Sequence, residues 1–234
     1  MIPKIIHYCW FGGNPIPEDA KKCIESWKKY CPDYEIIEWN EENFDVNCNT
    51  YTKMCYEQAK YAFLADYIRL VVVERYGGIY FDTDVEVLRS LDSLLNCPAF
   101  IGFENMQFIN TGEGFGAEAH NPVIQQMLKE YDPLLEGFYE FVSCPKLNTE
   151  AVQKFGLKLN GEKQKLKDVV IFPSDYFNPR NSVTGKLNKT KNTYSIHWYS
   201  GSWLSPKERL KSKITRPIHR LFGTNFLNKL RLKK

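Results

Sequence analysis

Two aspartates separated by a single residue are the chemically most informative feature of the sequence. Asp82 and Asp84 follow the short apolar run Ile79–Phe81, which we predict to be the end of a buried strand. Residues i and i+2 of an extended segment face the same side, so both carboxylates would lie together at the carboxyl edge of a sheet. No basic residue adjoins them, and a divalent ion such as Mn²⁺ or Mg²⁺ would relieve their repulsion. The pair predicts a metal site; a solvated acidic turn is the alternative.

A third aspartate lies upstream, three positions before an arginine. Asp66 and Arg69 belong to a largely apolar segment that we predict to be helical, so they share one face of the helix. A carboxylate acceptor beside a fork-shaped guanidinium donor suits sugar hydroxyls or a phosphate group. The alternative is an intrahelical ion pair that binds no ligand, and the spacing alone leaves both interpretations open.

Two ring side chains are further candidates for ligand binding, one for a metal ion and one for a nucleobase. His197 follows an apolar strand and precedes hydroxyl groups, a glycine and a tryptophan, and an imidazole suits Mn²⁺ better than Mg²⁺. Trp10 precedes Gly12 and Gly13 at the end of the first expected strand and offers a flat face to a nucleobase. A hydrogen-bonded structural histidine and a tryptophan packed in the core are the alternatives.

Strand and helix patterns alternate along the chain and predict the elements that must position these side chains. A surface loop is expected at 178–192, where Asn, Lys and Thr are frequent. Strands interleaved with helices indicate an α/β fold with a parallel or mixed sheet covered on both faces. The strands are expected at 2–8, 34–39, 79–81, 85–88, 99–104, 169–172 and 194–198, and the helices at 17–30, 52–76 and 122–137.

Taken together, these segments resemble the DXD glycosyltransferases of family 32. That family includes the yeast initiating α-1,6-mannosyltransferase and bacterial capsular-polysaccharide sugar transferases, and it is related to the glucosylating domains of large bacterial toxins. The resemblance implies a single GT-A type domain with a mixed, mostly parallel sheet and a Rossmann-like nucleotide-binding core. The matching segments are 2–13, 62–69, 76–84 and 197–203.

The resemblance also implies roles for individual residues. Arg69, Asp82 and Asp84 would be catalytic, and Asp82, Asp84 and His197 would bind Mn²⁺ or Mg²⁺. The residues implied in substrate binding are Trp10 at the base, Asp66, Arg69 and Tyr80 at the donor sugar and its phosphates, Asn110 at the sugar, and Ser202 and Trp203 near the diphosphate.

The implied activity is metal-dependent transfer of a sugar, with retention of configuration, from a nucleotide-sugar donor to a glycan acceptor. We favour a UDP-sugar as donor, with GDP-mannose next, and expect a lipid-linked acceptor in polysaccharide or surface-glycan biosynthesis. A phosphatase of the haloacid dehalogenase class also uses an Asp-x-Asp pair, and a nucleotide-sugar or glycan-binding module without turnover is a second alternative. The phosphatase is disfavoured because Glu86 stands where its motif has Thr or Val, and no later acidic pair follows.

Composition and charge limit the other possibilities. The 234 residues are 43% hydrophobic and 25% charged, and the seven cysteines show no zinc-site spacing, so we expect a cytoplasmic protein with reduced thiols. Residues 207–234 carry a net charge of +9 and the remainder −6, which argues against general nucleic-acid binding. We therefore divide the chain into a glycosyltransferase domain, 1–205, and a basic amphipathic tail, 206–234. The tail predicts a peripheral contact with the inner face of a membrane; a solvated helix is the alternative.

Overall fold

A seven-stranded sheet forms the centre of the computed structural model, which describes residues 1–137, 142–201 and 206–223. In spatial order its strands are β2 (Glu35–Trp39), β1 (Ile5–Cys9), β3 (Gly78–Tyr80), β6 (Ile109–Ala117), β5 (Ala99–Phe103), β8 (Val170–Phe172) and β7 (Gln164–Lys165). β6 and β7 run against the direction that the other strands share. The predicted α/β fold with a mixed, mostly parallel sheet is therefore confirmed.

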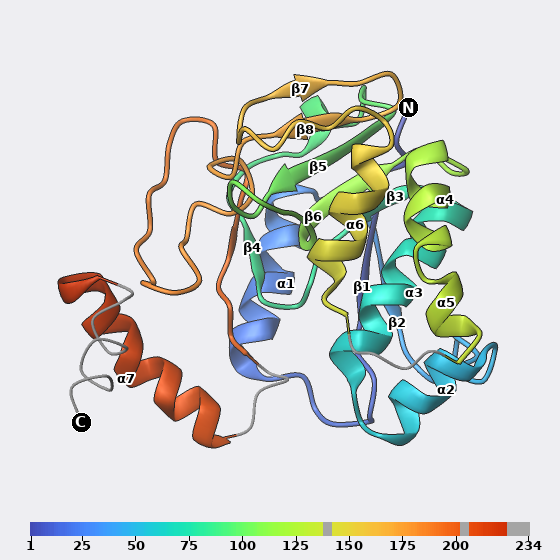
Figure 1. The fold of residues 1–234 in the computed structure, drawn as a ribbon, viewed down its shortest axis with the longest axis horizontal. Helices are drawn as coiled ribbons and strands as arrows, with labels where there is room; N and C mark the ends of the chain where they lie inside the picture. Colours follow the sequence, from blue (N-terminus) through green and yellow to red (C-terminus); the bar gives the residue numbers. More distant parts are fainter. Residues whose placement is uncertain (138–141, 202–205, 224–234) are drawn as a thin grey trace.

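Helices cover both faces of this sheet (Figure 1). The core on one side includes Val73 of α3 and Ile101 of β5, and the core on the other side includes Trp27 of α1 and Phe100 of β5. The strands are buried on both sides, which explains their continuous apolar runs. The helices around the sheet are α1 (Glu18–Tyr30), α2 (Thr50–Glu57), α3 (Tyr61–Tyr76), α4 (Pro122–Lys129), α5 (Asp132–Leu135) and α6 (Cys144–Gln153), with a 3₁₀ turn at Asp92–Leu94.

A second sheet of two strands joins distant parts of the chain. β4 (Val85–Val87) follows the two aspartates and pairs antiparallel with β9 (Ser195–His197), which sets His197 opposite Val85. α1 anchors this sheet, because the indole N–H of Trp27 donates to the carbonyl of Val85 at 2.7 Å. The β4–β9 pair therefore fixes where the late histidine lies relative to the early aspartates.

Two of the expected helices are each divided in two. The segment 52–76 was expected to be one helix, but it contains the end of α2 and the whole of α3, and the chain turns between them at Ala59, whose φ is +53°. The expected helix at 122–137 is α4 followed by the short α5. The first break contains no glycine or proline, so the sequence gave no sign of it, whereas Pro133 in the first turn of α5 marks the second break.

The strand β6, the helix α6 and the two-residue strand β7 were not expected. β6 has the sequence INTGEGFGA, whose glycines weaken any strand pattern, yet it pairs with β3 and β5 in the middle of the sheet. Its pairing with β5 shifts register between Ile101 and Gly102, so residues 111–114 have no partners on β5. α6 begins with a proline in its first turn and packs against β6.

The basic tail contains helix α7 (Pro206–Phe222), which lies apart from the sheet (Figure 1). A proline usually interrupts a helix, yet Pro217 lies inside α7. A proline removes one backbone hydrogen bond, and an exposed helix can direct the freed carbonyl to water. Among the helices of the described residues, none is long and apolar enough to cross a membrane.

Candidate active site

Asp82 and Asp84 lie in the turn that connects β3 to β4. The backbone N–H of Val85 donates to the carbonyl of Asp82 at 3.0 Å, and the N–H of Asp82 donates to the carbonyl of Gly112 in β6 at 3.0 Å. β9 brings His197 to the same place, and one ligand atom from each of Asp82, Asp84 and His197 lies within 4.8 Å of the others. The structure thus brings together the three residues that were predicted as metal ligands, and we call them the metal triad.

The carboxylate of Asp84 is held from two sides. Nε2 of His197 lies 3.1 Å from Oδ1, and the N–H of Ser200 donates to Oδ2 at 2.7 Å. Burial by itself would raise the pKa of Asp84, but His197 and Ser200 lower the pKa below its ordinary value. Burial opposes protonation of His197, yet the charge of Asp84 raises the pKa of the imidazole overall. Both shifts favour the charged forms of the pair, the imidazolium of His197 and the carboxylate of Asp84.

Arg69 lies between the other two carboxylates. Its guanidinium is 2.9 Å from Asp66 and 2.9 Å from Asp82, and the residue is only 3% exposed. The hydroxyl of Tyr80 donates to the same oxygen of Asp82 at 3.1 Å, and the Tyr80 ring lies 4.9 Å from the guanidinium carbon. Burial raises the pKa of both Asp66 and Asp82, and the charge of Arg69 only partly opposes that shift. The cluster therefore has more carboxylates than one arginine can neutralise.

The chemistry of the triad fits a divalent cation. Two carboxylates and one imidazole form a donor set that suits Mn²⁺, and Mg²⁺ less well because of the nitrogen. A cation would also relieve the raised pKa of Asp82, since the carboxylate would gain a second positive neighbour. Asp82, Asp84 and His197 are therefore the residues that could hold the ion.

β6 passes directly behind the triad because it has a glycine there. A Cβ on Gly112 would lie 2.3 Å from Oδ2 of Asp82 and 3.0 Å from Arg69, so no larger residue fits. Asn110, which was expected to contact the donor sugar, donates to Glu104 at 3.1 Å and accepts from the N–H of Gly112 at 2.7 Å. In this structure Asn110 shapes the turn of β6 that supports Asp82.

Glu113 is a buried acid that sequence reasoning missed. It is 0% exposed, and neither of its carboxyl oxygens has a partner among the described residues. Burial raises the pKa of Glu113 well above its ordinary value, and the charge of Glu104 raises it further. Charge from Glu113 also contributes to the raised pKa of Tyr199, whose ring stacks on His197 at 4.1 Å. The only signal in the sequence was an acid between Gly112 and Gly114 in a segment not expected to be a strand.

The remaining predicted residues are not all joined to the triad. Trp10 lies just beyond β1, half-buried, and its indole N–H donates to the carbonyl of Asn14 at 2.6 Å. Within the residues that the structure describes, none of its hydrogen bonds involves the triad. Ser202 and Trp203 lie outside the described residues. Their roles near base and diphosphate stay predictions.

Comparison with known families identifies the region around these residues. Residues 17–101 match the family described as the glycosyltransferase sugar-binding region containing the DXD motif. The chain is 37% identical over 108 residues to inositol phosphoceramide mannosyltransferase 3 of Schizosaccharomyces pombe. It is 38% identical over 113 residues to mannosyl phosphorylinositol ceramide synthase CSH1 of Saccharomyces cerevisiae. Each match takes in 43% of this chain and less than a third of the relative, 29% and 28% of their lengths.

Solved structures show the same fold. The PaToxG glycosyltransferase superimposes with a TM-score of 0.53 at 22% identity, over 65% of this chain and 68% of that one. A glycosyltransferase involved in glycosylation of the major capsid of PBCV-1 superimposes with a TM-score of 0.51 at 14% identity, over 91% and 99% of the two chains. In its sugar-binding region and its fold the chain is therefore similar to the DXD glycosyltransferases, which confirms the resemblance to family 32.

Proposed function

We propose that this chain is a metal-dependent, retaining glycosyltransferase that takes its sugar from a nucleotide-sugar donor. The observation that supports this most directly is the metal triad, formed from two distant segments that the β4–β9 pair brings together. It adjoins the ends of β1 and β3, at the sheet edge where open α/β folds bind ligands. The match to a sugar-binding region over residues 17–101 agrees with that position.

Each residue of the site has its own proposed role. When bound, the ion would supply positive charge where the leaving diphosphate becomes more negative. Arg69, buried between two carboxylates, fixes the direction of Asp82 and Asp66. Tyr80 adds a second bond to Asp82, and Gly112 leaves room for that side chain. Asp66 and Asn110 are proposed to contact the donor sugar, and Trp10 the base.

The donor and the acceptor are proposed as classes. Both fungal relatives are named for transfer of mannose or synthesis of a mannosylated lipid, so GDP-mannose must be tested beside the UDP-sugars that we favour. Their names also specify a lipid, an inositol phosphoceramide, which supports a lipid-linked acceptor here. We therefore place the enzyme at the inner face of a membrane, in contact through α7.

Thermal unfolding with nucleotides tests the proposal. The protein would be heated with UDP, GDP, UDP-sugars and GDP-mannose, each with and without Mn²⁺. A ligand at 100 times its Kd stabilises a protein by about 2.7 kcal/mol, which is a visible shift in Tm. We expect a Mn²⁺-dependent shift with one base, lost in Asp84→Asn and kept in Glu42→Gln, which removes an exposed carboxylate elsewhere.

Turnover then separates an enzyme from a binding module. Release of nucleotide from the donor that shifts Tm, dependent on Mn²⁺ and on Asp84, would support transfer. Binding without any turnover, with every acceptor class supplied, would favour the non-catalytic alternative. No shift with any nucleotide would contradict the proposal as a whole.

A further inference from the structure

Three arginines gather at the loop that follows β9. Arg180 donates to the carbonyl of Trp198, and Arg216 of α7 donates to the carbonyl of Tyr199 at 3.1 Å. A pocket between the loop at 180–185 and α7 is lined by Arg180, Thr184, Gly185, Arg216, Pro217 and Arg220. This three-arginine pocket is separate from the metal triad, although Trp198 and Tyr199 directly follow His197.

The positive charge of the pocket is not balanced by the protein. Among the described residues, none of the three arginines forms an ion pair, and Nε of Arg216 is buried without a partner. Burial lowers the pKa of Arg180, and the like charge of Arg216 lowers it further. Among the described carboxylates, the charge of Asp84 opposes that shift, and this carboxylate is already engaged by His197 and Ser200. Guanidinium groups held together in this way favour an anion, and their forked donors match the oxygens of a phosphate.

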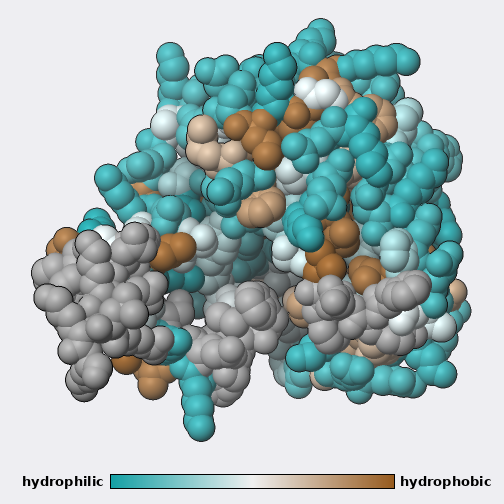
Figure 2. Space-filling model, in the orientation of Figure 1, coloured by the Kyte–Doolittle hydropathy of each residue, from teal (hydrophilic) through white to brown (hydrophobic). Residues whose placement is uncertain are grey.

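The outer face of α7 is apolar and exposed. Leu210, Ile214, Pro217 and Leu221 follow one another at spacings of four, three and four, which places them on one stripe of the helix. Leu210, Ile214 and Leu221 are 60%, 56% and 76% exposed. We call these four residues the apolar stripe. Figure 2 shows hydrophobic side chains at the surface in the part of the view that α7 occupies.

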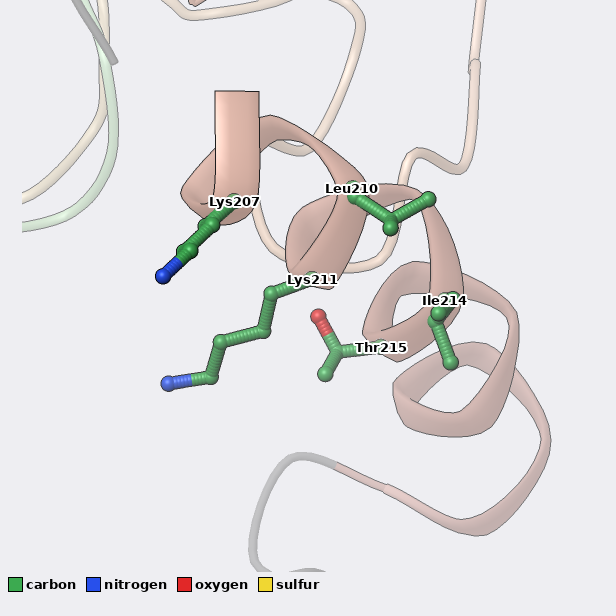
Figure 3. A pocket seen from close by; sticks show the side chains of 5 residues that line it. All are labelled: Lys207, Leu210, Lys211, Ile214 and Thr215. Atoms are coloured by element: carbon green, nitrogen blue, oxygen red, sulfur yellow. The ribbon is translucent and has the colours of Figure 1, made fainter. Parts of the chain in front are cut away.

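Basic residues flank the apolar stripe on both sides. Lys207 and Lys211 extend together from one flank, beside Leu210 and Ile214 (Figure 3). On a helical projection Arg216 and Arg220 fall on the opposite flank, toward the loop at 180–185. A helix with an exposed apolar stripe between two basic edges is typical of helices that lie in the interface of an anionic membrane.

We propose that the three-arginine pocket binds the headgroup phosphate of an anionic lipid while the apolar stripe of α7 lies in the membrane surface. The inference deepens the membrane contact of the proposed function and rests on it for the position of the acceptor. Because Arg180 and Arg216 bond the two carbonyls that follow His197, the occupied pocket would hold the metal triad close to the lipid surface. The site would then face acceptors presented by that surface.

Vesicle binding of the full chain tests the proposal. Sedimentation would use vesicles of phosphatidylcholine alone and with about one third phosphatidylglycerol, without nucleotide or Mn²⁺. Each basic side chain near an anionic surface contributes roughly fivefold to partitioning, so Arg220→Gln should weaken binding about fivefold. Lys22→Gln removes one exposed charge from α1 and should change nothing. Arg220 is exposed and forms no hydrogen bond or ion pair with the other described residues, so we expect its replacement to leave the fold intact.

A variant that conserves charge distinguishes a specific phosphate site from general electrostatic attraction to the anionic membrane. Arg180→Lys, Arg216→Lys and Arg220→Lys together keep the net charge but remove the forked donors. We expect a loss of tenfold or more in binding to the anionic vesicles, with the Tm of the free protein checked beside it. Binding equal to that of the unmodified protein would overturn the phosphate site and leave only diffuse attraction. If the triple variant does not fold, Arg220→Lys decides the same question by itself.

Two further binding experiments show whether the phosphate comes from a lipid headgroup or from a soluble molecule. Leu210→Gln with Leu221→Gln should abolish vesicle binding and leave the binding of soluble glycerol phosphate unchanged. An unmodified protein that binds inorganic phosphate through these arginines but no vesicle would overturn the lipid assignment. The vesicle assay contains no nucleotide, so a failure of the proposed sugar transfer would show in the nucleotide assay and not here.

Discussion

The buried carboxyl group of Glu113 makes a prediction whose size can be worked out from its surroundings. Its ordinary pKa is 4.5, and burial together with Glu104 raises the pKa in the folded protein well above that value. Above pH 4.5 the unfolded chain therefore holds fewer protons at this residue than the folded protein does. The free energy of unfolding falls as the pH rises, until the pH passes the pKa of the folded state.

The dependence of the unfolding free energy on pH gives the size of this effect. One pKa unit is worth about 1.4 kcal/mol, so at pH 7 keeping Glu113 protonated costs the folded state up to roughly 3 kcal/mol. Its unpartnered oxygens add about 1–3 kcal/mol of lost hydration. Glu113→Gln removes the first contribution, and Glu113→Met removes both while nearly keeping the volume, which matters because Gly102 leaves little space beside it. We expect the methionine variant to be more stable at pH 7 by about 3 kcal/mol or more.

Urea unfolding between about pH 5 and pH 8 measures the effect. The difference in unfolding free energy between each variant and the unmodified protein should grow with pH, by up to roughly 1.4 kcal/mol per pH unit, until the pH passes the raised pKa of Glu113. Glu42→Gln, at an exposed glutamate, is the matched control and should show no such slope. A difference that does not change with pH would refute the reasoning, because it would mean that Glu113 is ionised in the folded protein.

The other predictions concern the residues around the metal triad. Arg69→Gln removes the buried guanidinium that the partly buried Asp66 and Asp82 share and should destabilise the protein by about 3 kcal/mol in urea unfolding; a loss below 1 kcal/mol would contradict the coupling of this cluster. Gly112→Ala should displace Asp82 and weaken Mn²⁺ binding in calorimetry by tenfold or more, and unchanged affinity would mean that β6 moves aside. Mn²⁺ binding should weaken as the pH falls through the raised pKa of His197, since proton and metal compete for the imidazole, and His197→Gln should lose that dependence.

Local sequence was sufficient to predict several of the side chains that meet at the candidate site. Asp82 and Asp84 follow a strand of three residues, and Asp66 and Arg69 share one face of α3, as their spacing predicts. The spacing could not show that Arg69 also reaches Asp82, because that contact joins α3 to the turn after β3. The structure shows the intrahelical ion pair and also ties Arg69 to the DXD turn, while contact of this pair with a sugar or a phosphate stays a prediction.

What the sequence could not predict depends on long-range pairing. β6 is a strand because β3 and β5 need a partner between them, not because its glycine-rich residues prefer extended structure. Glu113 is a buried acid because β6 lies in the core, and the sequence around it does not indicate that position. The turn at Ala59 likewise depends on tertiary context that propensity does not record.

The β4–β9 pair determines when, during folding, the three residues of the metal triad come together. Ser200 and Asp84 are 116 residues apart in sequence yet joined by one hydrogen bond, so the loop that closes on the triad is among the longest in the chain. Long loops close late, after the local helices and hairpins have formed. A chain still leaving the ribosome would carry a folded α1 and both aspartates while lacking the third ligand. The capacity to bind the ion would therefore appear in a single late step, when β9 pairs with β4.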